Sequence, residues 1–393
     1  MDTSIWTIYM RGLHCKIFFF SGYTFSNVCS LKRFTASKGG PLQTKNIFTD
    51  ETDSLPKGKA DFLLAGSVTR TCEIEGITQA GIPGKIPYTP TLDAEFIVNE
   101  KLYSMPEIAE TPSGVPTPAL ITRAVHNLNA YETIEILDLG LTTKPQNTNL
   151  HDFNIEASEA INKGANIDAK EVFTKGMEFG KSYELKGNYL ILAESTPSGT
   201  TTAAASVLAL GYEAEGCFSS SFKDVPNDIR EKTIKEALGL VNDGMSNFEK
   251  LGVVSDNMLI FCAGFLLEAT KRFHVVLGGG TQMAACLLIA DKLREDVLMR
   301  INSKNLTLAT TAWVANDKNS DIKKLLGLLS YTPHAVYTEL SFTDAQIPVL
   351  KKYDEGEAKE GVGAGAALGF ANANGETNKS IVDAVELIMF GMM

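Results

Sequence analysis

Two glutamates, Glu194 and Glu360, each stand beside a loop of small residues that leads into a helical pattern. Unpaired backbone N–H groups and the positive end of the helix dipole make such a loop a site for phosphate. A carboxylate is repelled by a bound phosphate, so Glu194 is expected to face a ribose, a base or a water molecule. Glu360 is predicted to act as a base, because a partly closed pocket raises a carboxyl pKa toward the working pH.

The loop beside Glu194 follows the apolar run 189–193, which predicts a strand buried on both faces. Its candidate phosphate donors are Ser198, Gly199, Thr200 and Thr201. The lysine of the nucleotide triphosphatase loop is absent, so that class is not expected. The alternative interpretation is an ordinary Thr-rich helix start.

Two further glycine-rich loops share this organisation. Residues 274–293 predict a strand, a loop and a helix, and contribute Gly279, Gly280 and Thr281. Gly361 and Gly363 allow close backbone approach before a helix that begins near residue 364. A charged run, not a strand, precedes them, so a dinucleotide fingerprint is not expected. Glu360 has an alternative role as a first-turn acid that stabilises its helix.

Strands are expected at residues 133–141, 189–193, 258–262, 274–277 and 306–314, and residues 60–70 are expected to form a strand that runs into a loop. Helices are expected at 117–130, 167–181, 224–251, 263–273 and 322–329, and after each glycine-rich loop. This alternation predicts an α/β fold with a doubly wound, mostly parallel sheet in three layers. A smaller, largely helical part is expected from the terminal segments. Ligands of such sheets bind at the carboxyl ends of the strands.

Residues 72–118 are rich in Pro and Gly and predict a long irregular lid or binding loop. Asp93 and Glu95 lie within it, either as functional acids or as part of a solvated turn. Residues 1–55 form an atypical extension, and residues 56–393 the α/β domain. Within residues 1–50, six basic residues oppose two acidic ones, so the segment carries +4 and the remainder −15 of the net −11. A transit peptide or a misassigned start both fit this extension.

Composition excludes several classes. With 44% hydrophobic and 21% charged residues, the chain has the composition of a globular protein. The net charge of −11 argues against nucleic-acid binding, and no apolar run is long enough to span a membrane. The six cysteines form no C-x-x-C pair, which favours buried thiols, a reducing compartment and hence a cytoplasmic location.

These motifs, in order, resemble the nicotinate-nucleotide–dimethylbenzimidazole phosphoribosyltransferases, and within them an archaeal and cyanobacterial branch. The matching segments are ITQAGIP…YTPTLDAEF, GVPTPALITRA, EILDLGL, AESTPSGTTTAAA, AGFLLEA with VVLGGGTQMAA, and KEGVGAGAAL. They are spread over residues 60–390. Six ordered matches over most of the chain are a specific signal, although each alone is weak.

The resemblance implies transfer of the phosphoribosyl group of nicotinate mononucleotide to a benzimidazole-type base. The products are nicotinate and an α-ribotide for the lower ligand of cobalamin-type corrinoids. It implies Glu360 as the catalytic base and Glu194 as a second acid near the ribose. Residues 198–201 would hold the phosphate, and residues 279–281 would lie on the nicotinate side. No metal or organic cofactor is implied, and the family tends toward homodimers.

The sequence departs from the family pattern around both ligands. Gly199 stands where bacterial members have Asn, Lys359 replaces the glycine before the catalytic glutamate, and the second loop reads GGGTQ instead of D-G-F-x-S. These changes leave the accepted base open. Two other functions remain open as well: a non-catalytic mononucleotide-binding or sensor protein, and a different glycosyl or phosphate-ester enzyme on the same scaffold.

Overall fold

The structure is a computed structural model that describes residues 6–10, 13–17 and 40–392. The chain divides into two compact units, residues 1–38 and 39–393. In the first unit, β1 (Trp6–Met10) pairs antiparallel with β2 (Leu13–Ile17). The division lies before the expected boundary at residue 55, because β3 (Gln43–Asn46) belongs to the main sheet. The interpretation of the extension as a transit peptide or a misassigned start falls mostly outside the described residues.

One sheet of eight strands organises the second unit, in the order β3-β10-β9-β8-β7-β4-β5-β6. All neighbouring pairs are parallel except β3 with β10. From β4 the chain adds β5 and β6 on one side, and then β7 to β10 on the other. The direction therefore switches between β4 and β7, and the doubly wound α/β prediction is confirmed. The strands are β4 (Ala60–Gly66), β5 (Thr133–Asp138), β6 (Leu150–Asp152), β7 (Tyr189–Ser195), β8 (Val275–Gly278), β9 (Leu306–Thr311) and β10 (His334–Glu339).

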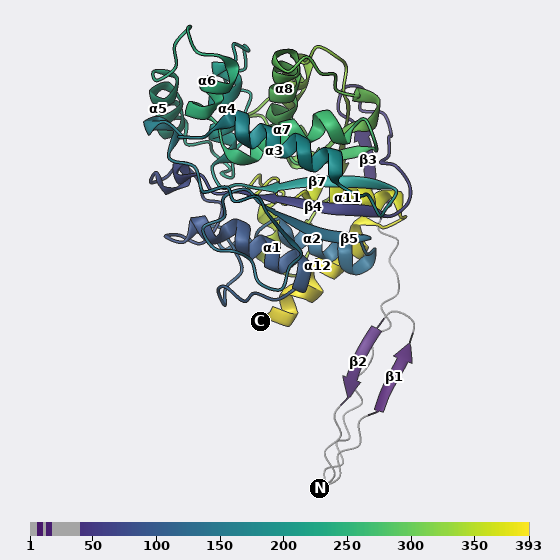
Figure 1. Cartoon of the computed structure of the whole chain (residues 1–393). Helices are drawn as coiled ribbons and strands as arrows, with labels where there is room; N and C mark the ends of the chain where they lie inside the picture. Colours follow the sequence, from purple (N-terminus) through teal and green to yellow (C-terminus); the bar gives the residue numbers. More distant parts are fainter. Residues whose placement is uncertain (1–5, 11–12, 18–39, 393) are drawn as a thin grey trace. The chain divides into compact units, whose positions relative to one another are not determined.

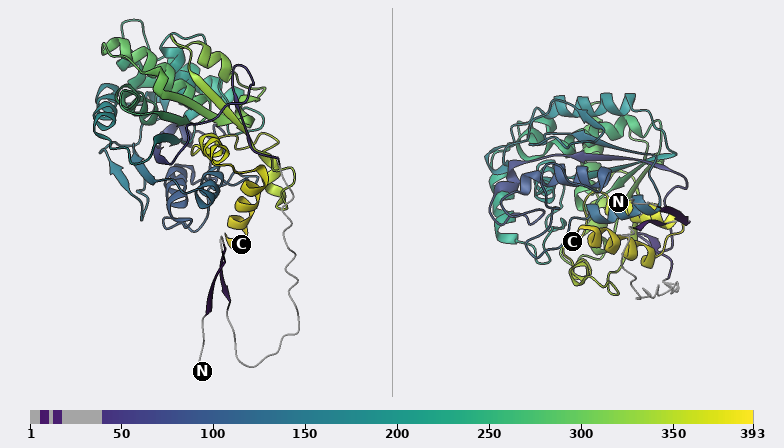
Figure 2. Two further views of the ribbon diagram at one scale, coloured as in Figure 1. Left: turned by 90° about the vertical axis from the view of Figure 1, so that its right-hand side faces the viewer. Right: turned by 90° about the horizontal axis from the view of Figure 1, so that it is seen from below.

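Helices cover both faces of this sheet and make three layers (Figures 1 and 2). Strand β7 shows why: Leu190 and Leu192 face one apolar cluster, whereas Tyr189, Ile191 and Ala193 face the other. The first face carries α3 (Ala169–Ser182), α4 (Gly199–Ala209), α7 (Asn257–Ala269) and α8 (Thr281–Asp296). The second face carries α1 (Thr89–Asn99), α2 (Ala119–Leu128), α11 (Ala364–Ala373) and α12 (Asn378–Met392).

Other helices complete the connections. They are α5 (Asn227–Leu238), α6 (Asn247–Val254), α9 (Ala312–Ala315) and α10 (Ile322–Gly327). The 3-10 helices are η1 (Arg70–Glu73), η2 (Ile86–Tyr88), η3 (Ile161–Lys163), η4 (Ser303–Asn305) and η5 (Pro348–Lys352). In the described part of the chain, no helix combines the length and apolarity needed to cross a membrane.

Several predicted elements were wrong. Residues 258–262 are not a strand but the start of α7, a helix buried on nearly all sides, so its sequence lacks helical periodicity. The predicted helix 224–251 is two helices, α5 and α6, and a capping box between Ser246 and Glu249 starts the second. The strand predicted at 306–314 ends at Thr311, whose hydroxyl caps α9. Strand β10 was not predicted.

The segment 72–118 is less irregular than predicted, because it contains α1. Pro90 does not break this helix, since it occupies the first turn, where its missing N–H costs no hydrogen bond. Asp93 and Glu95 are both buried in α1 and do not form a solvated turn. Glu95 accepts backbone hydrogen bonds from Tyr103, Ser104 and Gln146, so it anchors neighbouring loops.

Helix α11 lies directly on β9. A Cβ atom on Gly365 would be 2.1 Å from the carbonyl carbon and 2.3 Å from the Cα of Thr310. Real Cβ atoms do not approach backbone this closely, so only glycine fits. This contact fixes the start of α11 against the end of β9.

We therefore expect Gly365→Ala to lower the free energy of unfolding by about 3 kcal/mol, because the added methyl group must push α11 off the strand. The matched control is Gly327→Ala in α10, where no atom lies within 4 Å of the added Cβ. That variant should change stability by less than about 1 kcal/mol. Denaturant unfolding measures both, and equal effects of the two substitutions would contradict this account of the packing.

Candidate active site

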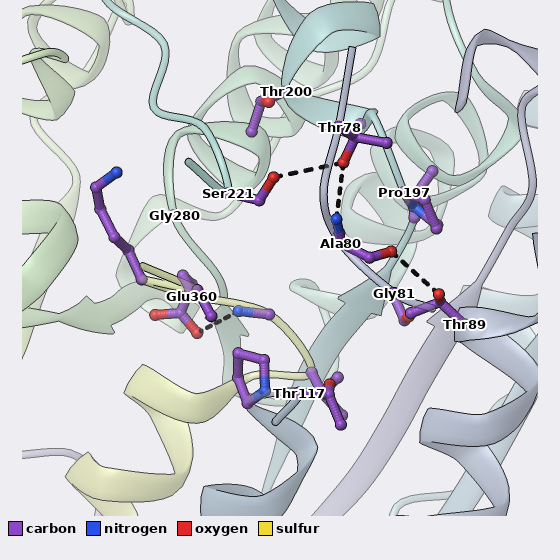
Figure 3. Close-up of a pocket in the computed structure, with 18 of the residues that line it drawn as sticks. Thr78, Ala80, Gly81, Thr89, Thr117, Pro197, Thr200, Ser221, Gly280 and Glu360 are labelled. Carbon is purple, nitrogen blue, oxygen red and sulfur yellow. Dashed lines mark hydrogen bonds between the residues drawn. The ribbon is translucent and has the colours of Figure 1, made fainter. Parts of the chain in front are cut away.

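A pocket opens at the carboxyl ends of β7, β8 and β9, beside the switch between β4 and β7 (Figure 3). We call it the central pocket. It holds about 900 Å³ of empty space, open solvent included. Its walls come from residues 78, 80–81, 89, 93, 109–111, 115–118, 194–200, 219–221, 280–282, 314 and 358–362. Parts of the predicted lid segment 72–118 therefore line it.

Glu194 lies near the end of β7, with its side chain buried in the pocket wall. One backbone group, the N–H of Thr196, donates to its Oε2 at 3.2 Å. Burial raises its pKa to about 8, and the negative charges of Glu360 and Asp256 act in the same direction. Glu194 is therefore largely protonated at neutral pH.

Glu360 lies in the loop before α11, and its carboxylate is held by four donors. The N–H groups of Gly361 and Gly365 donate to Oε1 at 3.2 and 3.1 Å. The Thr310 hydroxyl and the Thr311 N–H donate to Oε2 at 3.2 and 2.9 Å. These bonds favour the charged form, but burial outweighs them and raises the pKa of Glu360 to about 7.

A backbone hydrogen bond joins the segments that carry the two glutamates. The N–H of Val362 donates to the carbonyl oxygen of Glu194 at 2.8 Å, and the Val362 carbonyl accepts from the Thr122 hydroxyl at 2.8 Å. Val362 has a φ of 52°, which is strained for a β-branched residue. The surrounding structure thus holds this loop in an unfavourable conformation that brings Glu360 to the end of β7.

A third acid, Asp93 of α1, also lines the pocket. It is buried, and it accepts hydrogen bonds from the hydroxyls of Ser195 and Thr117, both at 2.7 Å. Burial raises its pKa to about 6, although both hydrogen bonds oppose the shift. Asp93 therefore connects α1 to the residue that follows Glu194.

Two buried cations, Lys359 and Arg230, hold the loop that contains residues 219–221. Lys359 Nζ donates to the carbonyl oxygens of Ser220 and Phe222 at 3.1 and 2.7 Å and lies 3.5 Å from Asp317. Burial lowers its pKa. Arg230 donates to the carbonyl oxygens of Phe218 and Thr200. Lys359, which departs from the resembled family pattern, thus binds the protein's own backbone.

The loops 78–81 and 219–221 contact each other beside the pocket. Gln79 Nε2 donates to the Ser221 carbonyl oxygen at 2.7 Å. The hydroxyls of Thr78 and Ser221 are 3.4 Å apart (Figure 3). These contacts connect the segment before α1 with the loop held by Lys359. Together they form one side of the central pocket.

The structure brings most of the predicted site residues together. Those that line the central pocket are Glu194, Ser198, Gly199, Thr200, Gly280, Thr281, Glu360 and Gly361. Thr201, Gly279 and Gly363 lie in the same loops but not in the lining. Thr117, Ser195, Gln282 and Ser219 were not predicted. Ser195 and Gln282 adjoin predicted residues, so their position in the loops was a usable signal. Thr117 lies in the predicted lid segment and in the motif GVPTPALITRA, whereas Ser219 had no signal.

The described residues contain no group of three His, Cys, Asp or Glu side chains placed to hold a metal ion. The cysteines with described side chains, Cys72, Cys217, Cys262 and Cys286, are free and buried, and none lines the pocket. The lining of the central pocket offers carboxyl groups, hydroxyls, the carboxamide of Gln282 and the ammonium group of Lys359.

Comparison with known proteins gives both a family and a fold. No protein-family model matches the chain. A UPF0284 protein of Sulfurisphaera tokodaii is 34% identical over 346 residues, which cover 87% of this chain and 96% of the relative. A UPF0284 protein of Archaeoglobus fulgidus is 34% identical over 350 residues, or 87% of this chain and 97% of the relative. The chain belongs to the UPF0284 family.

Two solved structures of proteins from Thermus thermophilus share the fold of this UPF0284 protein. One is a nicotinate-nucleotide-dimethylbenzimidazole phosphoribosyltransferase, with a TM-score of 0.54 and 16% identity, covering 84% of this chain and 83% of that chain. The other is named CobT, with a TM-score of 0.55 and 15% identity, covering 86% of this chain and 85% of that chain. At this identity the likeness shows the fold, which agrees with the predicted fold class.

The raised pKa of Glu194 predicts how stability depends on pH. The folded protein binds this proton more tightly than the unfolded chain, whose glutamate has a pKa of 4.5. The resulting stabilisation is complete below that pKa and is lost as the pH rises to about 8. Between pH 5 and pH 8, the free energy of unfolding of Glu194→Gln should therefore fall by about 2–4 kcal/mol less than that of the wild type.

Denaturant unfolding at the two pH values measures this difference. Comparing each variant with itself removes any constant cost of the substitution. Glu178→Gln, on the exposed side of α3, is the control for loss of a surface carboxylate. An unchanged pH dependence in Glu194→Gln would show that its carboxyl group is not protonated in the folded protein.

Proposed function

We propose that the protein transfers the phosphoribosyl group of nicotinate mononucleotide to a benzimidazole-type base. The observation that carries this proposal is the pair Glu194 and Glu360, two carboxyl groups with raised pKa values at one pocket that two helix N-termini also reach. The fold shared with the Thermus thermophilus phosphoribosyltransferase supports it. So does the ordered set of sequence motifs.

The reaction needs one base and no acid. The bond between ribose C1′ and the pyridinium nitrogen breaks, and its electron pair leaves with nicotinate. A ring nitrogen of the incoming base forms the new bond to C1′, and its N–H proton passes to a carboxylate. Negative charge beside the ribose also stabilises the positive charge that develops at C1′ in the transition state.

The two glutamates divide these tasks. Because they influence each other's ionisation, the proton taken from the base belongs to the pair. We assign proton abstraction to Glu360, whose pKa of about 7 suits a base at neutral pH. Glu194 lies on the ribose side, and its single donor from Thr196 leaves most of its lone pairs free. Because Glu194 is largely protonated at neutral pH, its role is to donate a hydrogen bond to the ribose, and Glu360 supplies the negative charge beside it.

The direct test is a product assay. The protein is incubated with nicotinate mononucleotide and 5,6-dimethylbenzimidazole, and mass spectrometry detects the α-ribotide and nicotinate. A panel of other benzimidazoles, phenols and adenine defines the accepted base. Absence of a ribotide with every member of the panel would contradict the proposal.

Variants test the assigned residues. Glu360→Gln should lower kcat by about 10²–10⁴-fold, because glutamine cannot accept the proton. Glu194→Gln should also lower kcat. Glu178→Gln should leave kcat and KM unchanged, since that side chain is exposed on α3, away from the pocket. Full activity of Glu360→Gln would remove that residue from the mechanism.

One observation favours a second function, mononucleotide binding without catalysis. Each oxygen of Glu360 already accepts two hydrogen bonds, which occupies the lone pairs that a base must offer. Calorimetry distinguishes the two functions: a binding protein would hold nicotinate mononucleotide tightly and turn over no base in the panel.

We further propose a homodimer, on the basis of the family resemblance. Light scattering on the purified full chain tests it, and a monomer mass would contradict it.

A further inference from the structure

Three buried polar atoms in the central pocket make no hydrogen bond to the described part of the chain. They are Thr196 Oγ1, Ser198 Oγ and Gln282 Nε2. All three residues line the pocket, and each is at most 7% exposed. An unsatisfied buried polar atom costs about 1–3 kcal/mol. Three of them in one pocket lining point to a ligand that supplies the missing partner.

Gln282 connects two loops that lie far apart in the sequence. It is the second residue of α8, and its side chain lies against Gly199, the first residue of α4. A Cβ atom at position 199 would be 2.2 Å from Gln282 Nε2 and 2.4 Å from its Oε1. Glycine at 199 therefore provides the space that the carboxamide fills. Ser198, with a left-handed φ of 66°, precedes this contact.

The electrostatics of the pocket restrict where an anion can bind. Asp93, Glu194 and Glu360 supply carboxyl groups, and Lys359 is engaged by backbone carbonyls and Asp317. Positive potential comes instead from the N-termini of α4 and α8, which both begin at the pocket. The orphaned hydroxyls and the carboxamide lie at these same two helix ends. They add hydrogen-bond donors without adding charge.

We propose that Gln282 determines specificity for a phosphorylated donor: its carboxamide, with the hydroxyls of Ser198 and Thr196, binds the phosphomonoester oxygens of the substrate. A phosphomonoester fits because all three groups can donate and its oxygens only accept when ionised. The identity of the donor as nicotinate mononucleotide rests on the proposed function. The role of Gln282 rests on the unpartnered atoms and the contact with Gly199.

The test compares nicotinate mononucleotide with nicotinate riboside, which lacks the phosphate. Gln282→Met keeps the length of the side chain but removes its donor. We expect KM for the mononucleotide to rise about 10–100-fold with kcat unchanged, because the lost contact binds ground state and transition state equally. Activity with the riboside should not change. Gln282→Glu should raise KM further, since a carboxylate repels the phosphate.

Gln43→Met is the matched control, because Gln43 is exposed on β3 and away from the pocket. It should leave both donors unaffected. A double variant, Gly199→Asn with Gln282→Ala, places a carboxamide from α4 in the space that Gln282 vacates, and should recover part of the affinity for the mononucleotide. Equal loss with mononucleotide and riboside would overturn the proposal, as would an unchanged KM for the mononucleotide in Gln282→Met.

Binding measurements separate this inference from the proposed reaction. If the wild type forms no ribotide, calorimetry with adenosine 5′-monophosphate, adenosine and inorganic phosphate still tests Gln282. The wild type should bind the monophosphate more tightly than adenosine, and Gln282→Met should lose that difference. Equal phosphate-dependent binding by the wild type and Gln282→Met would reject the role of Gln282, whatever the reaction.

Discussion

The central pocket depends on one backbone hydrogen bond, from the N–H of Val362 to the carbonyl oxygen of Glu194. It joins the end of β7 to a loop near the C-terminus, and it holds two mutually repelling carboxyl groups at one pocket. The left-handed conformation of Val362 is unfavourable, and the second bond, from Thr122, helps to maintain it. Helix α11 completes the arrangement, because the N–H of Gly365 donates to Glu360 while the same residue packs on β9.

This arrangement divides the pocket by charge. Its carboxyl groups favour a cationic group, and the ends of α4 and α8, with their neutral donors, favour an anionic one. The proposed substrate has both, a pyridinium at one end and a phosphate at the other. The buried cations Lys359 and Arg230 bind backbone carbonyls, so they stabilise the shape of the pocket. In the proposed reaction, the placement of neutral dipoles and carboxyl groups orients the nucleotide.

Sequence reasoning succeeded where local patterns carry the information. The strand, loop and helix around Glu194 follow from an apolar run and small residues, and the structure has them at the predicted place. It failed where burial on all sides removes the helical periodicity of the sequence. Helix α7 is apolar nearly all round, so its first residues were predicted to be a strand. The roles of Asp93 and Gln282 were only partly predictable, for another reason. Their importance depends on contacts with residues 195 and 199, which are distant in sequence and become neighbours only in the folded sheet.

The pairing of β3 with β10 has a consequence for how the protein is made. These strands lie near opposite ends of the chain, yet they are neighbours at the edge of the sheet. A nascent chain leaving the ribosome must keep β3 unpaired until β10 has been synthesised, and the loop with Glu360 follows later still. Such long-range closure is slow, because the entropy of the intervening chain opposes it. The pocket therefore forms only after nearly the whole polypeptide has been translated, and ribosome-bound fragments that end before β10 lack it.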